Sequence, residues 1–140
     1  MRFILDSAVF INSDSFPFNE KDEYVMPSSC EKEIKEKVAV MRLHAALDQH
    51  SNFTITDPCF ASIQTVRMWA KAQGNSRLSP ADESVLALAF ESFDRKEKVM
   101  VFTDDYSIQN ILKWARIPFS GILQKGITKK RVFGKKRLKQ

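Results

Sequence analysis

Residues 99–105 read Val-Met-Val-Phe-Thr-Asp-Asp, a short apolar run that ends in two acidic residues. An apolar run bounded by polar residues is typical of a strand that is buried on both faces of a parallel sheet. The amino terminus follows the same pattern, because the run Phe3–Leu5 ends at Asp6. Stretches with apolar residues at helical spacing separate such runs. Strands that alternate with helices predict an α/β domain with a mainly parallel sheet.

Start and stop signals place the other elements. The capping-box spacing of Ser28 and Glu31 predicts the start of a helix, and Asp57 with Pro58 predicts the start of another, which Gly74 ends. The expected strands are residues 3–5, 24–26, 53–56, 99–102 and 119–123, and residues 12–22 are expected to form an exposed loop. The expected helices are a turn at 8–11, a helix after Ser28 that buries Ile34, Val38, Met41 and Ala45, a helix over 58–74, a helix from Pro80 capped by Ser79, and a helix that buries Ile108, Ile111, Leu112 and Ala115.

The acids that follow the strands indicate a cation site. Carboxyl ends of parallel strands meet at one edge of a sheet, so Asp6, Asp104 and Asp105 are expected to lie close together. A carboxylate beside a buried strand is costly unless it is paired or bound to a cation. Asp6, Asp82 and Asp105 could each instead cap a helix, but convergence of several acids favours a cation. Carboxylates without nearby His or Cys suit Mg²⁺ or Mn²⁺ rather than zinc.

The charges divide the chain into two parts. The formal net charge of the 140 residues is +5, yet residues 125–140 carry eight Lys or Arg and no acid. The remaining 14 basic and 17 acidic residues give residues 1–124 a net charge of −3. We therefore expect one domain over 1–124 and a basic tail over 125–140, although the tail could simply be a solvated terminus. A basic arm can bind nucleic acid through its phosphates, and the tail residues expected to make such contacts are Lys129, Lys130, Arg131, Lys135, Lys136, Arg137 and Lys139.

The first residues and the cysteines suggest the cellular setting. Asp6 precedes any sustained apolar run, so we expect no signal peptide, no spanning helix and no membrane partner, and hence a cytoplasmic protein. Cys30 and Cys59 lack the spacing of a zinc site, which favours two reduced and partly buried thiols.

The order of these acids resembles the PIN-domain ribonuclease family. Its signature has an Asp after the first strand, a Glu on an early helix, an Asp that opens a later helix and one or two Asp after the fourth strand. The resemblance implies a three-layer α/β/α domain with about five strands in its central sheet. It also implies metal-dependent cleavage of RNA by water, which leaves a 3′-hydroxyl and a 5′-phosphate. The matching residues here are Asp6, Glu33, Asp82, Asp104 and Asp105.

Two longer motifs resemble the Nob-type branch of this family, which trims the 3′ end of small-subunit ribosomal RNA. Residues 74–82 read Gly-Asn-Ser-Arg-Leu-Ser-Pro-Ala-Asp and residues 103–110 read Thr-Asp-Asp-Tyr-Ser-Ile-Gln-Asn, and residues 126–127 also fit. Asn75 departs from the Asp of that branch, and the chain ends where the branch continues into a zinc ribbon. The resemblance implies an endoribonuclease whose partners are a single-stranded region of ribosomal RNA precursor and the pre-ribosomal particle.

The resemblance assigns a role to each acid. Asp6, Asp82 and Asp104 would hold the metal, while Glu33 and Asp105 would complete the shell or position a second ion. Glu31 remains an alternative to Glu33, which precedes Ile34 as in the family, and the choice between Asp104 and Asp105 stays open. Thr103 and Ser7 are expected to support the ligands. His44 and His50 are expected to be surface or core residues, and Tyr106, Trp69 and Trp114 are left outside the site as core residues.

Two other functions share these features. The chain could be a toxin ribonuclease of the VapC type, which is held by a small antitoxin partner. It could also be an RNA-binding PIN module that has lost catalysis. The second alternative fits poorly with Asp6, Glu33, Asp82 and Asp104, because a pure RNA binder gains nothing from acids that face phosphate.

Overall fold

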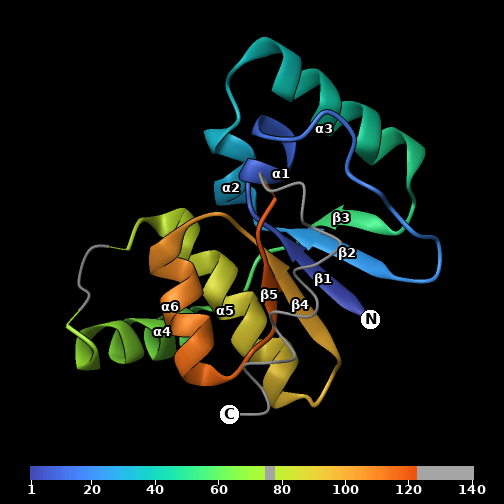
Figure 1. Cartoon of the computed structure of the whole chain (residues 1–140). Helices are drawn as coiled ribbons and strands as arrows, with labels where there is room; N and C mark the ends of the chain where they lie inside the picture. The colour runs from blue at the N-terminus through green and yellow to red at the C-terminus, as the bar shows by residue number, and fades with distance from the viewer. Residues whose placement is uncertain (75–77, 123–140) are drawn as a thin grey trace.

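A five-stranded parallel sheet forms the centre of the protein (Figure 1). The computed structural model describes residues 1–74 and 78–122. The strands lie in the order β3-β2-β1-β4-β5, and every neighbouring pair is parallel, as the sequence predicts. The strands are β1 (Arg2–Leu5), β2 (Glu23–Met26), β3 (Phe53–Ile55), β4 (Val99–Phe102) and β5 (Phe119–Ser120), and the helices are α1 (Ala8–Ile11), α2 (Ser28–Glu33), α3 (Lys37–Gln49), α4 (Phe60–Ala72), α5 (Pro80–Asp94) and α6 (Tyr106–Ala115).

The central position of β1 decides where the site forms. Leu5 of β1 pairs with Phe102 of β4, and the backbone N–H of Asp6 donates to the Phe102 carbonyl at 3.1 Å. The register therefore brings Asp6 beside Thr103, each directly after its strand. The two carboxyl ends share one edge of the sheet, as the strand patterns predict.

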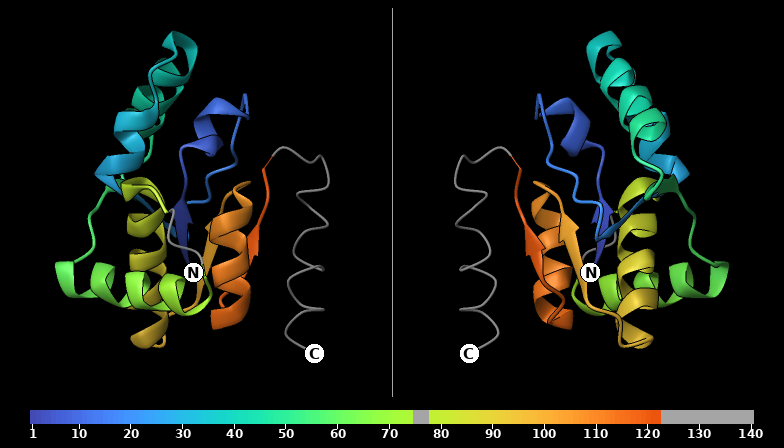
Figure 2. Two further views of the ribbon diagram at one scale, coloured as in Figure 1. Left: turned by 90° about the vertical axis from the view of Figure 1, so that its left-hand side faces the viewer. Right: turned by 90° about the vertical axis from the view of Figure 1, so that its right-hand side faces the viewer.

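Helix α5 is the main support of the sheet. It packs against β1 and β4, and α4 packs on α5, so both helices lie on the same side of the sheet (Figure 2). The predicted start of α5 is confirmed, because Ser79 and Asp82 form a reciprocal capping box with Pro80 in the first turn. The fold is consistent with the expected three-layer α/β/α arrangement. The buried residues of α5 are Ala81, Ser84, Val85, Leu86, Ala87, Leu88, Ala89, Phe90 and Ser92.

The single helix expected after Ser28 is wrong, because the chain breaks it into α2 and α3. Ile34 has an extended backbone, and Glu36 caps α3 by accepting hydrogen bonds from the N–H groups of Val38 and Ala39. The expected capping box is also absent, since Pro27 precedes the first residue of α2 and supplies no side-chain cap. The break rotates the buried face. Val38, Met41 and Ala45 are exposed, and the buried residues of α3 are Ala39, Leu43 and Ala46.

Two loop predictions also need correction. Helix α4 begins at Phe60 rather than Pro58, because the carboxylate of Asp57 accepts hydrogen bonds from the N–H and hydroxyl of Ser28 instead of capping α4. The loop over residues 12–22 is not wholly exposed. Phe16 and Phe18 pack against the core, where both rings contact Tyr24.

Other expectations concern the cysteines, the membrane and the tail. Both cysteines are free thiols, but Cys30 is buried and Cys59 is exposed.

Within the described residues, no helix combines the length and apolar character needed to cross a membrane. Strand β5 is shorter than expected, and Leu123 and the tail lie outside the described residues.

Candidate active site at the carboxyl edge of the sheet

Asp6 is the most buried acid of the site, with a side chain held from several sides. Its residue exposure is 8%, and burial raises the pKa of its carboxyl. Oδ2 accepts a 2.8 Å hydrogen bond from the Thr103 hydroxyl, and Oδ1 accepts a 2.7 Å bond from the backbone N–H of Ser7. These bonds favour the charged form and oppose the effect of burial. Asp6 is therefore a carboxylate fixed in orientation at the end of the central strand.

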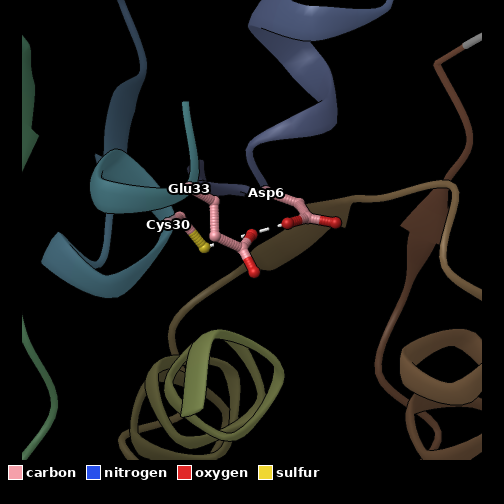
Figure 3. Close-up of side chains that lie close together, drawn as sticks. All are labelled: Asp6, Cys30 and Glu33. Carbon is pink, nitrogen blue, oxygen red and sulfur yellow. Dashed lines mark hydrogen bonds between the residues drawn. The ribbon is translucent and has the colours of Figure 1, made fainter. Parts of the chain in front are cut away.

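Glu33 meets Asp6 from the end of α2. The Ser7 hydroxyl donates to Glu33 Oε1 at 3.1 Å and lies 3.4 Å from Asp6 Oδ1, so one serine links both acids. Asp6, Cys30 and Glu33 converge, and their potential ligand atoms lie within 4.8 Å of one another (Figure 3). The structure thus brings Glu33, and not Glu31, into this group.

Cys30 is a contact that the sequence analysis missed. Its buried thiol donates to Asp6 Oδ1 at 3.8 Å. Burial raises the pKa of this thiol, and the charges of Asp6 and Glu33 raise it further. The thiol therefore favours its protonated form and, as a donor, helps to position the Asp6 carboxylate. Cys30 and Glu33 are three residues apart, which places both on one face of α2. This spacing was the signal in the sequence that could have indicated a contact of Cys30 with the site.

Asp82 reaches the site from the first turn of α5. Its Oδ2 accepts a 3.2 Å hydrogen bond from the backbone N–H of Ser79, while the Ser79 hydroxyl accepts from the Asp82 N–H. Burial raises the pKa of Asp82 to about 6, and the charges of Asp105 and Asp6 contribute to the rise. Asp82 is thus both a helix cap and a member of a mutually repelling group of acids.

Asp104 and Asp105 point to different partners. Asp105 caps α6 through a 2.7 Å bond from the Ser107 N–H, and its charge raises the pKa values of both Asp6 and Asp82. Asp104 instead accepts bonds from the Ile122 N–H at 2.7 Å and from Asn12 Nδ2 at 3.2 Å.

A glycine allows this approach of the Asp104 carboxylate to the chain. An added Cβ on Gly121 would lie 2.9 Å from Asp104 Oδ1, which is closer than real Cβ atoms come to other atoms. Gly121 therefore leaves room for Asp104 to bind the segment that follows β5.

Thr103 joins the two sides of the site. It is fully buried, and its hydroxyl accepts a 3.0 Å bond from the Asp105 N–H while donating to Asp6. Its carbonyl accepts a 2.8 Å bond from Gln109 Nε2 of α6. Thr103 therefore aligns Asp6 with the start of α6.

Several other sequence candidates lie away from the acids. His44 is exposed, and His50 stacks on Phe18 with ring centroids 4.4 Å apart. Two of the aromatic residues expected in the core are instead exposed, namely Tyr106 at 80% and Trp114 at 67%. The basic tail residues lie outside the described part of the chain: Lys129, Lys130, Arg131, Lys135, Lys136, Arg137 and Lys139.

The family model described as the PIN domain of ribonuclease matches residues 3–91. The chain belongs to the PIN-domain ribonuclease family. The match begins in β1 and includes three of the PIN-domain acids, namely Asp6, Glu33 and Asp82. It therefore confirms the family that the order of the acids suggested.

Three curated relatives of this PIN domain carry the name Endoribonuclease Nob1. The relative from Methanothermobacter thermautotrophicus is 37% identical over 91% of this chain and 72% of its own length. The relative from Pyrococcus abyssi is 29% identical over 92% of this chain and 73% of its own length. The relative from Archaeoglobus fulgidus is 35% identical over 56% of this chain and 48% of its own length. The resemblance to the Nob-type branch is therefore confirmed.

The donor chemistry of this PIN-domain site fits a divalent cation. Asp6 and Glu33 offer hard oxygen atoms within the close group, and Asp82 and Asp105 lie outside that group but interact electrostatically with Asp6. Among residues 1–74 and 78–122, none of these four acids forms a salt bridge with Lys or Arg. A bound cation would offset the charges of Asp105 and Asp6, which add to the effect of burial in raising the pKa of Asp82.

Proposed function

We propose that this PIN-domain protein is a metal-dependent endoribonuclease that cleaves single-stranded RNA. The observation that carries the proposal is the convergence of Asp6 and Glu33, with Asp82 and Asp105 close enough for the charge of Asp105 to act on both Asp6 and Asp82. Among the described residues, none of these four acids forms a salt bridge with Lys or Arg. Three relatives that bear the name of an endoribonuclease support the same activity. The reaction is hydrolysis of a phosphodiester bond, with water as the nucleophile.

We assign Asp6, Asp82, Asp105 and Glu33 as the residues that hold Mg²⁺ or Mn²⁺. When bound, the cation supplies Lewis-acid chemistry, because it lowers the pKa of water and stabilises charge on a phosphate. We prefer Asp105 to Asp104 as a ligand because the charge of Asp105 raises the pKa values of both Asp6 and Asp82. Asp104 is assigned to holding the segment after β5, through its bond from Ile122.

The neighbours of Asp6 prepare it for this role. Thr103 and the Ser7 N–H each donate to a different oxygen of Asp6, so its carboxylate plane is fixed before a ligand arrives. The Ser7 hydroxyl keeps Glu33 beside Asp6, and the Cys30 thiol donates from the buried side. Partners of this kind orient metal ligands, and their loss commonly costs about 10–100-fold in metal affinity or activity.

We propose ribosomal RNA precursor as the substrate, within a pre-ribosomal particle in the cytoplasm. The names of the three relatives support this choice over a toxin that is paired with an antitoxin. The acidic body has a net charge of −3 and must approach a polyanion, so we assign phosphate contacts to the basic residues of the tail over 125–140.

The test is cleavage of a labelled single-stranded RNA that spans the 3′ end of small-subunit ribosomal RNA. We expect cleavage with Mn²⁺, no cleavage with EDTA, and loss of cleavage in Asp6→Asn and Asp82→Asn. Asp48→Asn is the control, because Asp48 is an exposed acid on α3. Cleavage that survives EDTA or both site substitutions would contradict the proposal. Binding without cleavage by the wild type would favour an inactive RNA-binding module.

A further inference from the structure

A surface groove between α4 and α6 is not used by the acidic site. Met68, Trp69, Ala72 and Gln73 of α4 line one side of the groove, and Asn110, Ile111 and Trp114 of α6 line the other. Figure 1 shows the two helices next to each other, with α6 beginning shortly after the end of β4. Met68 and Trp114 are 71% and 67% exposed, so large apolar side chains face solvent here. Exposed apolar surface with a polar surround commonly marks a binding site.

The tryptophans are concentrated at this groove. The chain has two tryptophans, Trp69 and Trp114, and both line it. Trp69 is held by an edge contact with Phe90, whereas Trp114 stands free enough to offer its ring to a ligand. A flat aromatic ring that faces solvent can stack on a nucleobase of any sequence.

The charge of the two helices favours a polyanion as the occupant. Neither α4 nor α6 contains an Asp or Glu, although the whole chain has 17. The two helices carry Arg67, Lys71 and Lys113, all exposed, and Arg67 is paired with Glu83 of α5. Lys71 and Lys113 do not line the groove, but they carry positive charge on the two helices that form it, and the described lining of the groove contains no acid. RNA matches this combination through its phosphates and bases, whereas an acid-free face offers no carboxylate to a basic protein partner.

Helix α6 connects the groove to the acids. Tyr106 directly follows Asp105, is 80% exposed, and stands four residues before Asn110 and eight before Trp114. Residues at this spacing lie along one side of a helix. At about 1.5 Å per residue, Tyr106 and Trp114 are separated by about 12 Å along the helix axis. Tyr106, Asn110 and Trp114 thus form a stripe that leads from the acidic site into the groove.

We propose that the α4–α6 groove binds a single-stranded segment of the RNA substrate next to the cleaved bond. Bases stack on Tyr106 and Trp114, the Asn110 amide hydrogen-bonds to a base edge, and Lys71 and Lys113 contact phosphates. This assignment rests on the proposed nuclease function and adds the surface that positions the RNA.

The tryptophan fluorescence of the intact protein tests the groove directly. A short oligouridylate is titrated in EDTA, so that binding is measured without cleavage. We expect saturable quenching of the emission, and an affinity about fivefold to a hundredfold weaker in Trp114→Ala, the range expected for the loss of one base–aromatic stack. Trp114→Phe keeps a ring and should restore most of the affinity. Phe60→Ala is the control, because Phe60 is 67% exposed on α4 but does not line the groove.

Cleavage kinetics with Mn²⁺ separate this proposal from the nuclease proposal. Trp114→Ala and Tyr106→Ala should raise KM and leave kcat near that of the wild type. If the wild type cleaves RNA and both variants keep its KM, the groove proposal is wrong and the nuclease proposal stands. If the oligonucleotide binds without changing the tryptophan emission, RNA does not occupy the groove, and a protein partner becomes the better candidate. If the wild type binds RNA in EDTA with quenching but never cleaves it, the groove proposal stands and the nuclease proposal fails.

Discussion

The hydroxyl of Thr103 donates a 2.8 Å hydrogen bond to Asp6 Oδ2 across 97 positions of sequence. The bond joins the ends of β1 and β4, and it is one of the forces that lower the pKa of Asp6 against the effect of burial. It therefore keeps a buried carboxylate ready for a cation.

Replacing Thr103 with valine should uncouple these two strand ends. Thr103→Val keeps the shape but leaves Asp6 Oδ2 and the Asp105 N–H without their partner. We expect Mn²⁺ affinity to fall by about 10–100-fold and the free energy of unfolding to fall by about 1–3 kcal/mol. Calorimetry and chemical denaturation measure the two effects. Thr103→Ser keeps the hydroxyl and should restore affinity, and equal affinity in Thr103→Val and wild type would refute the positioning role.

Asparagine substitutions at Asp104 and Asp105 should differ in their effects. Asp105→Asn removes a charge that acts on Asp6 and Asp82, so we expect Mn²⁺ affinity to fall by more than about tenfold. Asp104→Asn keeps an oxygen that can accept from the Ile122 N–H and should lower the affinity less. Metal titrations of the two variants compare them directly. If Asp104→Asn lowers the Mn²⁺ affinity more than Asp105→Asn does, Asp104 is the better candidate for a metal ligand.

The two glutamates of α2 form a matched pair. Glu33→Gln removes a charge that Ser7 holds beside Asp6, so weaker Mn²⁺ binding and slower cleavage are expected. Glu31→Gln changes the same helix outside this group and should behave like wild type. The ratio of the two dissociation constants is the measurement. A ratio near one would contradict the assignment of Glu33.

Asp82 should make stability depend on pH. Its pKa is raised from 3.8 in an unperturbed carboxyl to about 6, so between these values the folded protein binds more protons than the unfolded chain. The contribution of Asp82 to the free energy of unfolding should therefore fall as pH rises from about 4 to 6. Asp82→Asn removes the repulsion and should melt higher than wild type above pH 6, by roughly 3 °C for each kcal/mol relieved.

Melting curves across this pH range check the prediction. The difference in Tm between Asp82→Asn and wild type should shrink toward pH 4, and Asp48→Asn should not reproduce it. Added Mn²⁺ should raise the Tm of the wild type at pH 7 more than that of Asp82→Asn. A Tm difference between Asp82→Asn and wild type that does not grow between pH 4 and 6 in the absence of metal would contradict the role given to Asp82.

Removal of residues 125–140 should weaken RNA binding and reduce its salt dependence. The segment carries eight Lys or Arg, and each phosphate contact to single-stranded RNA contributes about 0.7 to the slope of log affinity against log salt. Affinity measured over a range of salt concentrations gives this slope. An unchanged slope in the shortened protein would rule out the tail as an RNA contact.

The regular parts of the fold could be predicted because their signals are local. The apolar runs of β1 and β4 and the Ser79–Asp82 capping box each lie within a few residues. The break between α2 and α3 could not be predicted in this way. Glu36 caps α3 but stands in a stretch rich in Glu and Lys, where its type also suits a helix interior. Because a single continuous helix was predicted, Val38 and Met41 were expected to be buried, whereas both are exposed.

The site shows a similar limit. The strand-end rule could indicate that Asp6 and the acids after β4 share an edge of the sheet. The rule could not predict that Asp104 and Asp105 have different partners. Asp104 accepts hydrogen bonds from Asn12, which is 92 positions away, and from Ile122. The contact of the Cys30 thiol with Asp6 spans 24 positions, so the sequence could indicate only that Cys30 shares a face of α2 with Glu33. The metal-binding roles themselves remain predictions.

The position of β1 has a consequence for the newly made protein. Asp6 is translated almost a hundred residues before Thr103 and Asp105, which follow β4. A nascent chain therefore carries an incomplete set of acids until β4 and the residues that follow it have been translated. Such a chain should be inert toward RNA near the translating ribosome, because the activity requires the finished sheet.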